Sequence, residues 1–295
     1  MTDLSENIGQ KRSSDYWVVT SCTPQYIPGL IALRNSMEMF FPEGSLACFM
    51  YDQGEELDLP DRVHYIHNAP MLGTIINQGG AFRHGLRLGP DMYSRLLIPK
   101  YFKGKVFYVD VDCAILQSLK EAWELDLEGY PTACVLREDI GWIGGAVEDK
   151  MASGTFLCDT DMWESIGMVE KVFQVMEDYY QGKIKRQFNV NVESTLAYAH
   201  DNNFLPLNRK YQNLAYYGIL SQEDKIIHWG GPKPWKISKH QLKSEDACYQ
   251  DLWTCFYNND KEKASELLSK LPETLAEKIH WRQNKSKRQR GKKIL

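Results

Sequence analysis

Two acids, Asp110 and Asp112, follow an apolar segment at residues 105–109. Side chains two positions apart on a strand point to the same side, so both carboxylates should project from the end of that strand. Open α/β sheets bind ligands at this edge, and paired carboxylates suit a hard cation such as Mn²⁺ or Mg²⁺. Phosphate oxygens of a nucleotide diphosphate could complete its shell. An isolated Asp-x-Asp triplet is also typical of an ordinary turn, so other residues must decide.

A second cluster of residues with suitable chemistry lies at 227–235, in the order Ile-His-Trp-Gly-Gly-Pro-Lys-Pro-Trp. The imidazole of His228 can be a third protein ligand for a cation held by two carboxylates. Gly231 allows the backbone to approach a phosphate, and Lys233 supplies positive charge to a departing diphosphate. Taken alone, a histidine in an apolar strand is more often a core residue.

Several motifs occur in a fixed order along residues 17–236, and together they resemble glycosyltransferase family 8, the retaining GT-A enzymes. The 227–235 block is the most specific of them, because the family pattern is His, then Gly, then Lys-Pro-Trp at this spacing. The other matching motifs are Tyr93-Ser94-Arg95-Leu96, Asp110-Val111-Asp112, Ser153-Gly154, and Gln187 with Asn191.

The resemblance implies a UDP-sugar donor, a bound Mn²⁺ (or Mg²⁺), and ligands at Asp110, Asp112 and His228. It places Arg95 near the phosphates or the sugar, against the alternative of a surface ion pair. Ser153, Gly154 and Asn191 would face the sugar, and Val111 and Gly231 would line the nucleotide. The uridine would lie against the first strand and the loop after it, at Thr20, Ser21, Thr23 and Tyr26.

Two departures from the family pattern concern the sugar. Ala152 stands where the family usually has Asn, and Arg186 stands where it has Asp, next to the retained Gln187. We expect Gln187, Lys233 and Arg186 to act at the reacting centre. Gln187 has no carboxylate for a double displacement, so the resemblance favours front-face transfer of a hexose with retention of configuration.

Two other functions stay open. A sugar-nucleotide-binding protein with weak or no transferase activity would explain Ala152 and Arg186. A nucleotidyltransferase is disfavoured because no glycine-rich basic signature occurs near the N-terminus. The acceptor would be a hydroxyl group on a glycan, a glycolipid or a protein.

The composition is that of an ordinary globular protein, with 43% hydrophobic and 25% charged residues. A net charge of -4 disfavours a protein that wraps nucleic acid over its whole surface. Seven cysteines without a CxxC pair indicate buried free thiols in a reducing compartment. No signal peptide is evident, and no apolar run approaches the ~20 residues that span a bilayer. We therefore expect a cytoplasmic protein.

Alternating strand and helix patterns predict an α/β fold, which the resemblance specifies as GT-A: a Rossmann-like mixed sheet flanked by helices. Strands are expected at 16–21, 46–51, 62–66, 105–109, 131–136, 155–158 and 226–228. Helices are expected within 30–37, 92–101 (limited by Pro99), 119–123, 162–180, 190–200, 245–257 and 262–281.

The expected domains are a flexible leader at 1–15, a GT-A catalytic domain at 16–240, a C-terminal helical region at 241–280 and a basic tail at 281–295. The end of the chain carries several Lys and Arg residues without an acid among them, and Trp281 lies nearby. This composition suits either a solvated tail or peripheral contact with the anionic inner face of a membrane.

Overall fold

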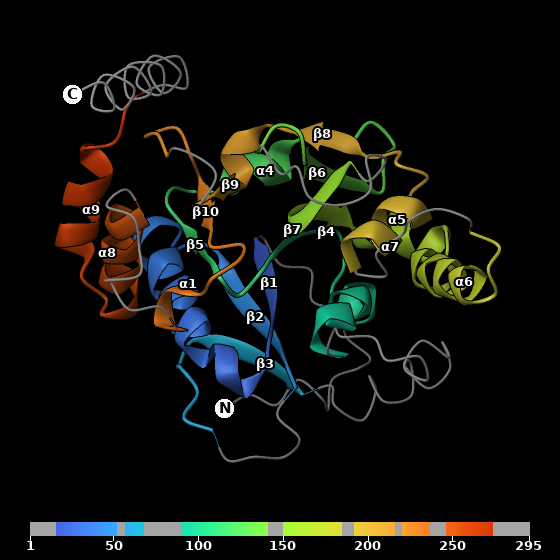
Figure 1. The fold of residues 1–295 in the computed structure, drawn as a ribbon, viewed down its shortest axis with the longest axis horizontal. Coiled ribbons are helices and arrows are strands. Elements are labelled where there is room, and N and C mark those ends of the chain that lie inside the picture. Colours follow the sequence, from blue (N-terminus) through green and yellow to red (C-terminus); the bar gives the residue numbers. More distant parts are fainter. Residues whose placement is uncertain are drawn as a thin grey trace, which may run out of the picture.

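The computed structural model describes residues 16–51, 57–67, 90–140, 150–184, 192–215, 220–236 and 246–273. Its largest element is a seven-stranded sheet in the order β3-β2-β1-β4-β7-β6-β8 (Figure 1). The strands are β1 (Trp17–Cys22), β2 (Ser45–Met50), β3 (Val63–His67), β4 (Lys105–Val109), β6 (Thr132–Leu136), β7 (Met151–Asp159) and β8 (Leu205–Leu207).

The large sheet is mixed, as the sequence predicts. Strands β3, β2, β1 and β4 run parallel, whereas β7 is antiparallel to both β4 and β6. Because β1 and β4 are parallel neighbours, their carboxyl ends meet at one edge of the sheet. The loop after β1 and the acids after β4 therefore lie side by side, at the position where open α/β sheets bind ligands.

A second, three-stranded sheet has the order β5-β10-β9. Its strands are β5 (Cys113–Ile115), β9 (Asn213–Leu214) and β10 (Ile226–His228). Strand β10 pairs antiparallel with β5, and His228 lies opposite Cys113. This register brings His228 beside the acid pair, although they are far apart in sequence.

The helices around the sheets follow the expected pattern, with three corrections. The helix expected at 262–281 ends at Ser269, and residues 270–273 are not helical. The helix expected at 162–180 is two helices, because Gly167, with a φ of 62°, separates them. Pro99 lies in the first turn of a short helix instead of ending a longer one. The described α-helices before α8 are α1 (Ile27–Phe40), α3 (Ile98–Tyr101), α4 (Lys120–Glu124), α5 (Thr160–Ser165), α6 (Met168–Tyr180) and α7 (Val192–Ala199). The described 3-10 helices are η2 (Pro24–Tyr26), η4 (Pro90–Leu97), η5 (Arg209–Tyr211) and η6 (Pro234–Lys236).

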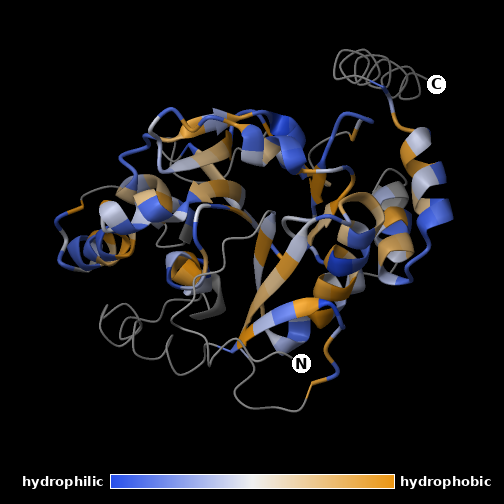
Figure 2. Cartoon of the chain, turned by 180° about the vertical axis from the view of Figure 1, so that it is seen from behind, coloured by the Kyte–Doolittle hydropathy of each residue, from blue (hydrophilic) through white to orange (hydrophobic). Residues whose placement is uncertain are grey.

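Hydrophobic side chains cover both faces of the large sheet. Along β4, Val106 and Tyr108 pack into one core cluster, whereas Phe107 and Val109 pack into the other. This alternation is the period of two expected of a strand that is buried on both faces. Figure 2 shows the hydrophobic residues along the central strands. Six described cysteines are buried free thiols, as predicted: Cys22, Cys48, Cys113, Cys134, Cys158 and Cys255.

Helices α8 (Asp246–Tyr257) and α9 (Lys261–Ser269) form the last described part of the chain. They share a third core cluster with α1 and β10, and Asn35 of α1 donates a hydrogen bond to the carbonyl of Phe256 at 2.7 Å. The leader at 1–15, the domain boundary at 240 and the tail at 281–295 lie outside the described residues. Among the described helices, none is long and apolar enough to cross a membrane.

Candidate active site

Asp110 and Asp112 lie in a turn that joins β4 to β5. The amide of Asp110 donates to the carbonyl of Gly154 at 2.8 Å, and the amide of Cys113 donates to the carbonyl of Asp110 at 3.0 Å. The two acids therefore follow the strand instead of extending it, which differs from the expected strand geometry. Both carboxylates nevertheless face the same histidine.

The Nε2 atom of His228 lies 3.3 Å from Oδ1 of Asp112 and 3.8 Å from Oδ2 of Asp110. On the other side of the ring, Nδ1 of His228 is 3.4 Å from Nε2 of Gln212. The Oε1 atom of Gln212 accepts hydrogen bonds from the amide and the hydroxyl of Thr155, at 3.1 and 3.0 Å. The imidazole is thus held between the acid pair and an anchored amide.

Gly154 provides the space for this imidazole. A Cβ atom on Gly154 would lie only 2.6 Å from Cε1 and 2.7 Å from Nδ1 of His228. The glycine belongs to a bulge in β7, because the pairing of β6 with β7 shifts register between Cys134 and Leu136. The strand expected at 155–158 therefore starts earlier, at Met151, and residues 152–154 lie within β7.

Lys233 provides a cationic partner for Asp112. Its Nζ contacts Oδ2 of Asp112 and donates to the carbonyl of Trp229 at 3.3 Å. Burial alone would raise the pKa of Asp112, but His228 and Lys233 outweigh burial and hold that pKa well below its usual value. Asp112 is therefore anionic. Gly231, with a φ of 121°, lies in the turn that leads from β10 to Lys233.

Arg95 holds the Asp110 carboxylate in place. Its guanidinium donates to the carbonyl of Ser153 at 2.8 Å and to Oδ1 of Asp110 at 3.0 Å. It also lies 4.2 Å from the centre of the Tyr108 ring, and the Tyr108 hydroxyl donates to the same Asp110 oxygen at 3.0 Å. The Arg95 side chain is only 3% exposed, so it forms a buried ion pair and not the surface pair considered as an alternative.

A cleft of about 160 Å³ opens beside the acid pair. Thr20, which was predicted to contact the uridine, is fully buried in β1 and is not among the residues that line this cleft. The Tyr26 ring packs edge-on against Trp235, and Nζ of Lys236 lies 5.1 Å from the centre of the Tyr26 ring. The cleft joins the predicted nucleotide residues to the acids, and its lining is Ser21, Thr23, Tyr26, Arg95, Tyr108, Asp110, Val111, Asp112 and Lys233.

Glu193 places a partly buried carboxylate next to Ser153, and the sequence alone did not identify it. Oε1 of Glu193 accepts the Ser153 amide at 3.2 Å, and Oε2 lies 3.8 Å from Arg137. Burial raises the pKa of Glu193. Charges thus alternate from Asp110 through Arg95 and the Ser153 peptide to Glu193 and Arg137. No local motif marks Glu193, whereas Gln187, Arg186 and Asn191 lie outside the described residues and stay predictions.

The donor set fits a divalent cation. Ligand atoms of Asp112, Cys113 and His228 lie within 4.8 Å of one another. Asp110 places a second carboxylate beside His228. Burial raises the pKa of the Cys113 thiol well above its usual value, so it stays protonated and ligates poorly. A site of two carboxylates and one imidazole suits Mn²⁺ better than it suits a metal that prefers thiolate ligands.

Comparison with known proteins gives a consistent result. A model described as Glycosyl transferase family 8 matches residues 63–238, more than half of the chain. Glycosyltransferase GlyB of Streptococcus pneumoniae serotype 4 is 25% identical over 186 residues, which cover 56% of this chain and 41% of GlyB. General stress protein A of Bacillus subtilis is 22% identical over 182 residues, which cover 52% of this chain and 62% of that protein. The chain thus spans less than two thirds of either relative.

Solved structures share the fold. The galactosyltransferase LgtC, in complex with donor and acceptor sugar analogues, has a TM-score of 0.59 at 15% identity, covering 82% of this chain and 95% of LgtC. The apo form of GlyE from Streptococcus pneumoniae TIGR4 has a TM-score of 0.58 at 17% identity, covering 87% of this chain and 64% of GlyE. The expected GT-A fold is confirmed.

Proposed function

The chain belongs to glycosyl transferase family 8, and we propose that it transfers a hexose from a UDP-sugar to a hydroxyl acceptor on a glycan, a glycolipid or a protein. The supporting observation is the meeting of Asp110, Asp112, His228 and Lys233 beside a cleft at the carboxyl ends of β1 and β4. In this proposal the uridine occupies the end of the cleft at Ser21, Thr23 and Tyr26.

Asp110, Asp112 and His228 would hold Mn²⁺ or Mg²⁺. When bound, the cation supplies Lewis-acid stabilisation of the diphosphate. Lys233 adds a fixed positive charge against the same oxygens and so favours departure of UDP. The Arg95 guanidinium keeps Asp110 in place and aligns the Ser153 peptide, where the sugar would lie. Gly231 lets the backbone approach the phosphates.

Retention of configuration would follow from a front-face substitution. The bond from the anomeric carbon to the phosphate oxygen breaks, and its electron pair stays on UDP. The acceptor oxygen forms the new bond on the same face and gives its proton to the departing phosphate. Gln187 would stabilise the positive anomeric centre without forming a bond to it. Because Arg186 stands where the family has an Asp, Glu193 would supply the carboxylate that is missing at that position.

Binding of a sugar nucleotide without transfer is the second candidate. Ala152 favours it, because this side chain is buried in β7 and offers no hydrogen bond where the family usually has an amide. Binding and turnover must therefore be measured separately.

The test is a screen of UDP-sugars for hydrolysis and transfer, with and without Mn²⁺, on the wild-type chain and Asp110→Asn. We expect Mn²⁺-dependent release of UDP by the wild type and its loss in the variant. Asp61→Asn is the control, because that side chain is 76% exposed and distant from β4 in sequence. Full activity of Asp110→Asn would refute the metal assignment. Mn²⁺-dependent UDP binding without turnover of any donor would favour the second candidate.

A further inference from the structure

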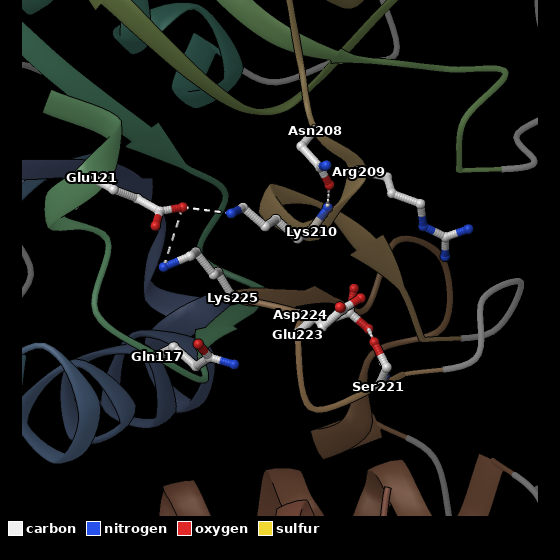
Figure 3. Close-up of a pocket in the computed structure, with 9 residues that line it drawn as sticks. All are labelled: Gln117, Glu121, Asn208, Arg209, Lys210, Ser221, Glu223, Asp224 and Lys225. Carbon is white, nitrogen blue, oxygen red and sulfur yellow. Dashed lines mark hydrogen bonds and ion pairs between the residues drawn. The ribbon is translucent and has the colours of Figure 1, made fainter. Parts of the chain in front are cut away.

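A polar cavity lies at the end of β10 opposite to His228. Its volume is about 410 Å³, within the range of roughly 300–1,000 Å³ that is usual for ligand pockets. All nine lining residues are polar or charged, and they come from the β5–α4 connection, α4, the segment after β8 and the segment before β10 (Figure 3): Gln117, Glu121, Asn208, Arg209, Lys210, Ser221, Glu223, Asp224 and Lys225.

Hydrogen-bond donors are in excess on one side of this cavity. One oxygen of Glu121 lies 2.6 Å from Nζ of Lys210 and 3.4 Å from Nζ of Lys225 (Figure 3). The same oxygen accepts a hydrogen bond from the Tyr211 hydroxyl at 2.7 Å. One carboxylate thus serves two ammonium groups. Lys225 also donates to the carbonyl of Ser118 at 2.7 Å. Each ammonium group carries three N–H donors, so Lys210 and Lys225 together can still donate hydrogen bonds to a ligand.

Carboxylates line the same cavity. Asp224 is buried, and its Oδ2 accepts from the Ser221 amide at 2.6 Å and from Asn213 at 2.9 Å, which fixes its position. Glu223 beside it is exposed. The lining therefore contains three cations and three acids, so a simple anion would meet carboxylates, and an apolar ligand would find no apolar side chain.

A compound with several hydroxyl groups matches this lining best. Each hydroxyl both accepts and donates a hydrogen bond, so a neighbouring pair can accept from Lys or Arg and donate to a carboxylate. A second cavity of about 250 Å³ adjoins the first and reaches α9 at Ser265 and Leu268. Gln117, Ser221 and Asp224 line both cavities, and the two adjoining cavities are called the groove below.

We propose that this groove binds an oligosaccharide, the acceptor glycan, at sugar units remote from the reacting end. This inference rests on the proposed function, because it selects a glycan among the possible acceptors. Lys225 immediately precedes β10 and His228 ends it, so the two residues are about 10 Å apart at the rise of a strand. A single sugar ring cannot reach from the groove to the acid pair, so the groove would select longer acceptors.

The test is binding of the whole chain to a printed array of neutral and acidic oligosaccharides. Arg209→Ala and Glu223→Ala remove lining side chains, and we expect either to weaken binding of the preferred glycan about tenfold, the loss of a charged hydrogen bond. Lys183→Ala, at a side chain 60% exposed and outside the lining, is the matched control and should bind as the wild type does. UDP affinity should be unchanged in all three variants.

Three results would overturn the proposal. The first is that the array binds no glycan. The second is that binding depends on Asp110, tested with Asp110→Asn, and not on Arg209 or Glu223, which would place the glycan in the donor cleft. The third is competition by inorganic phosphate, which would make the groove an anion site. If instead no UDP binds while glycan binding depends on Arg209, the proposed donor is wrong and the groove stands.

Discussion

Replacement of Gly154 by alanine tests the assignment of His228 as a metal ligand. The added Cβ would lie 2.6 Å from Cε1 of His228, whereas ordinary contact begins at 3.4 Å, so the ring must retreat by about 0.8 Å. Metal sites tolerate displacements of about 0.2 Å in a ligand distance. His228 should therefore stop ligating, and we expect Mn²⁺ affinity to fall about 10- to 100-fold.

The assay is a Mn²⁺ titration in the presence of UDP, in which electron paramagnetic resonance measures the concentration of free Mn²⁺. Thermal unfolding of each variant checks that it is folded, because overpacking costs about 1–3 kcal/mol. Ser153→Ala is the neighbouring control, since it keeps the two backbone hydrogen bonds of residue 153.

A double-mutant cycle with His228→Ala makes the test specific. If the methyl group acts through the imidazole, the combined variant should lose little more affinity than His228→Ala alone. Wild-type Mn²⁺ affinity in a folded Gly154→Ala protein would refute the reasoning, and so would fully additive losses.

Two further predictions concern buried groups. Arg95→Lys should lower the rate of the proposed sugar transfer about 10- to 100-fold, measured by steady-state kinetics, because one ammonium group cannot replace the two guanidinium hydrogen bonds that join Asp110 to Ser153. An unchanged rate would contradict this role. Burial lowers the pKa of His200 in the folded protein below its usual value of 6.5. Just below pH 6.5 the imidazole therefore takes up a proton in the unfolded chain but not in the folded one. Stability should therefore fall on acidification from pH 7.5 to 5.5, and the midpoint of thermal unfolding should fall less in His200→Gln; equal falls would contradict the assignment.

The sequence was sufficient to predict the long strands and the residues with recognisable chemistry. Strands such as β1 and β4 carry enough apolar residues to show a pattern, and the acids and His228 occur in ordered motifs. The strands β5, β8 and β9 have three, three and two residues, too few for an alternation of period two to be visible.

Contacts between distant segments could not be predicted either. Gln212 and Glu193 act through hydrogen bonds to Thr155 and Ser153, and no local pattern marks them. The bulge in β7 depends on its pairing with β6, so the sequence does not show that the strand extends back through Ser153 and Gly154. That Gly154 faces the sugar stays a prediction, whereas the space that its missing side chain leaves for His228 is visible only in the structure.

The pairing of β5 with β10 has a consequence for the order in which the site forms during synthesis. Asp112 and Lys233 are 121 residues apart. At a ribosomal rate of about 5–20 residues per second, Lys233 leaves the peptidyl-transferase centre roughly 6–24 s after Asp112. For that time a nascent chain carries its acid pair with Arg95 but without Lys233. The cleft beside the acids is completed only after all seven strands of the large sheet have been synthesised.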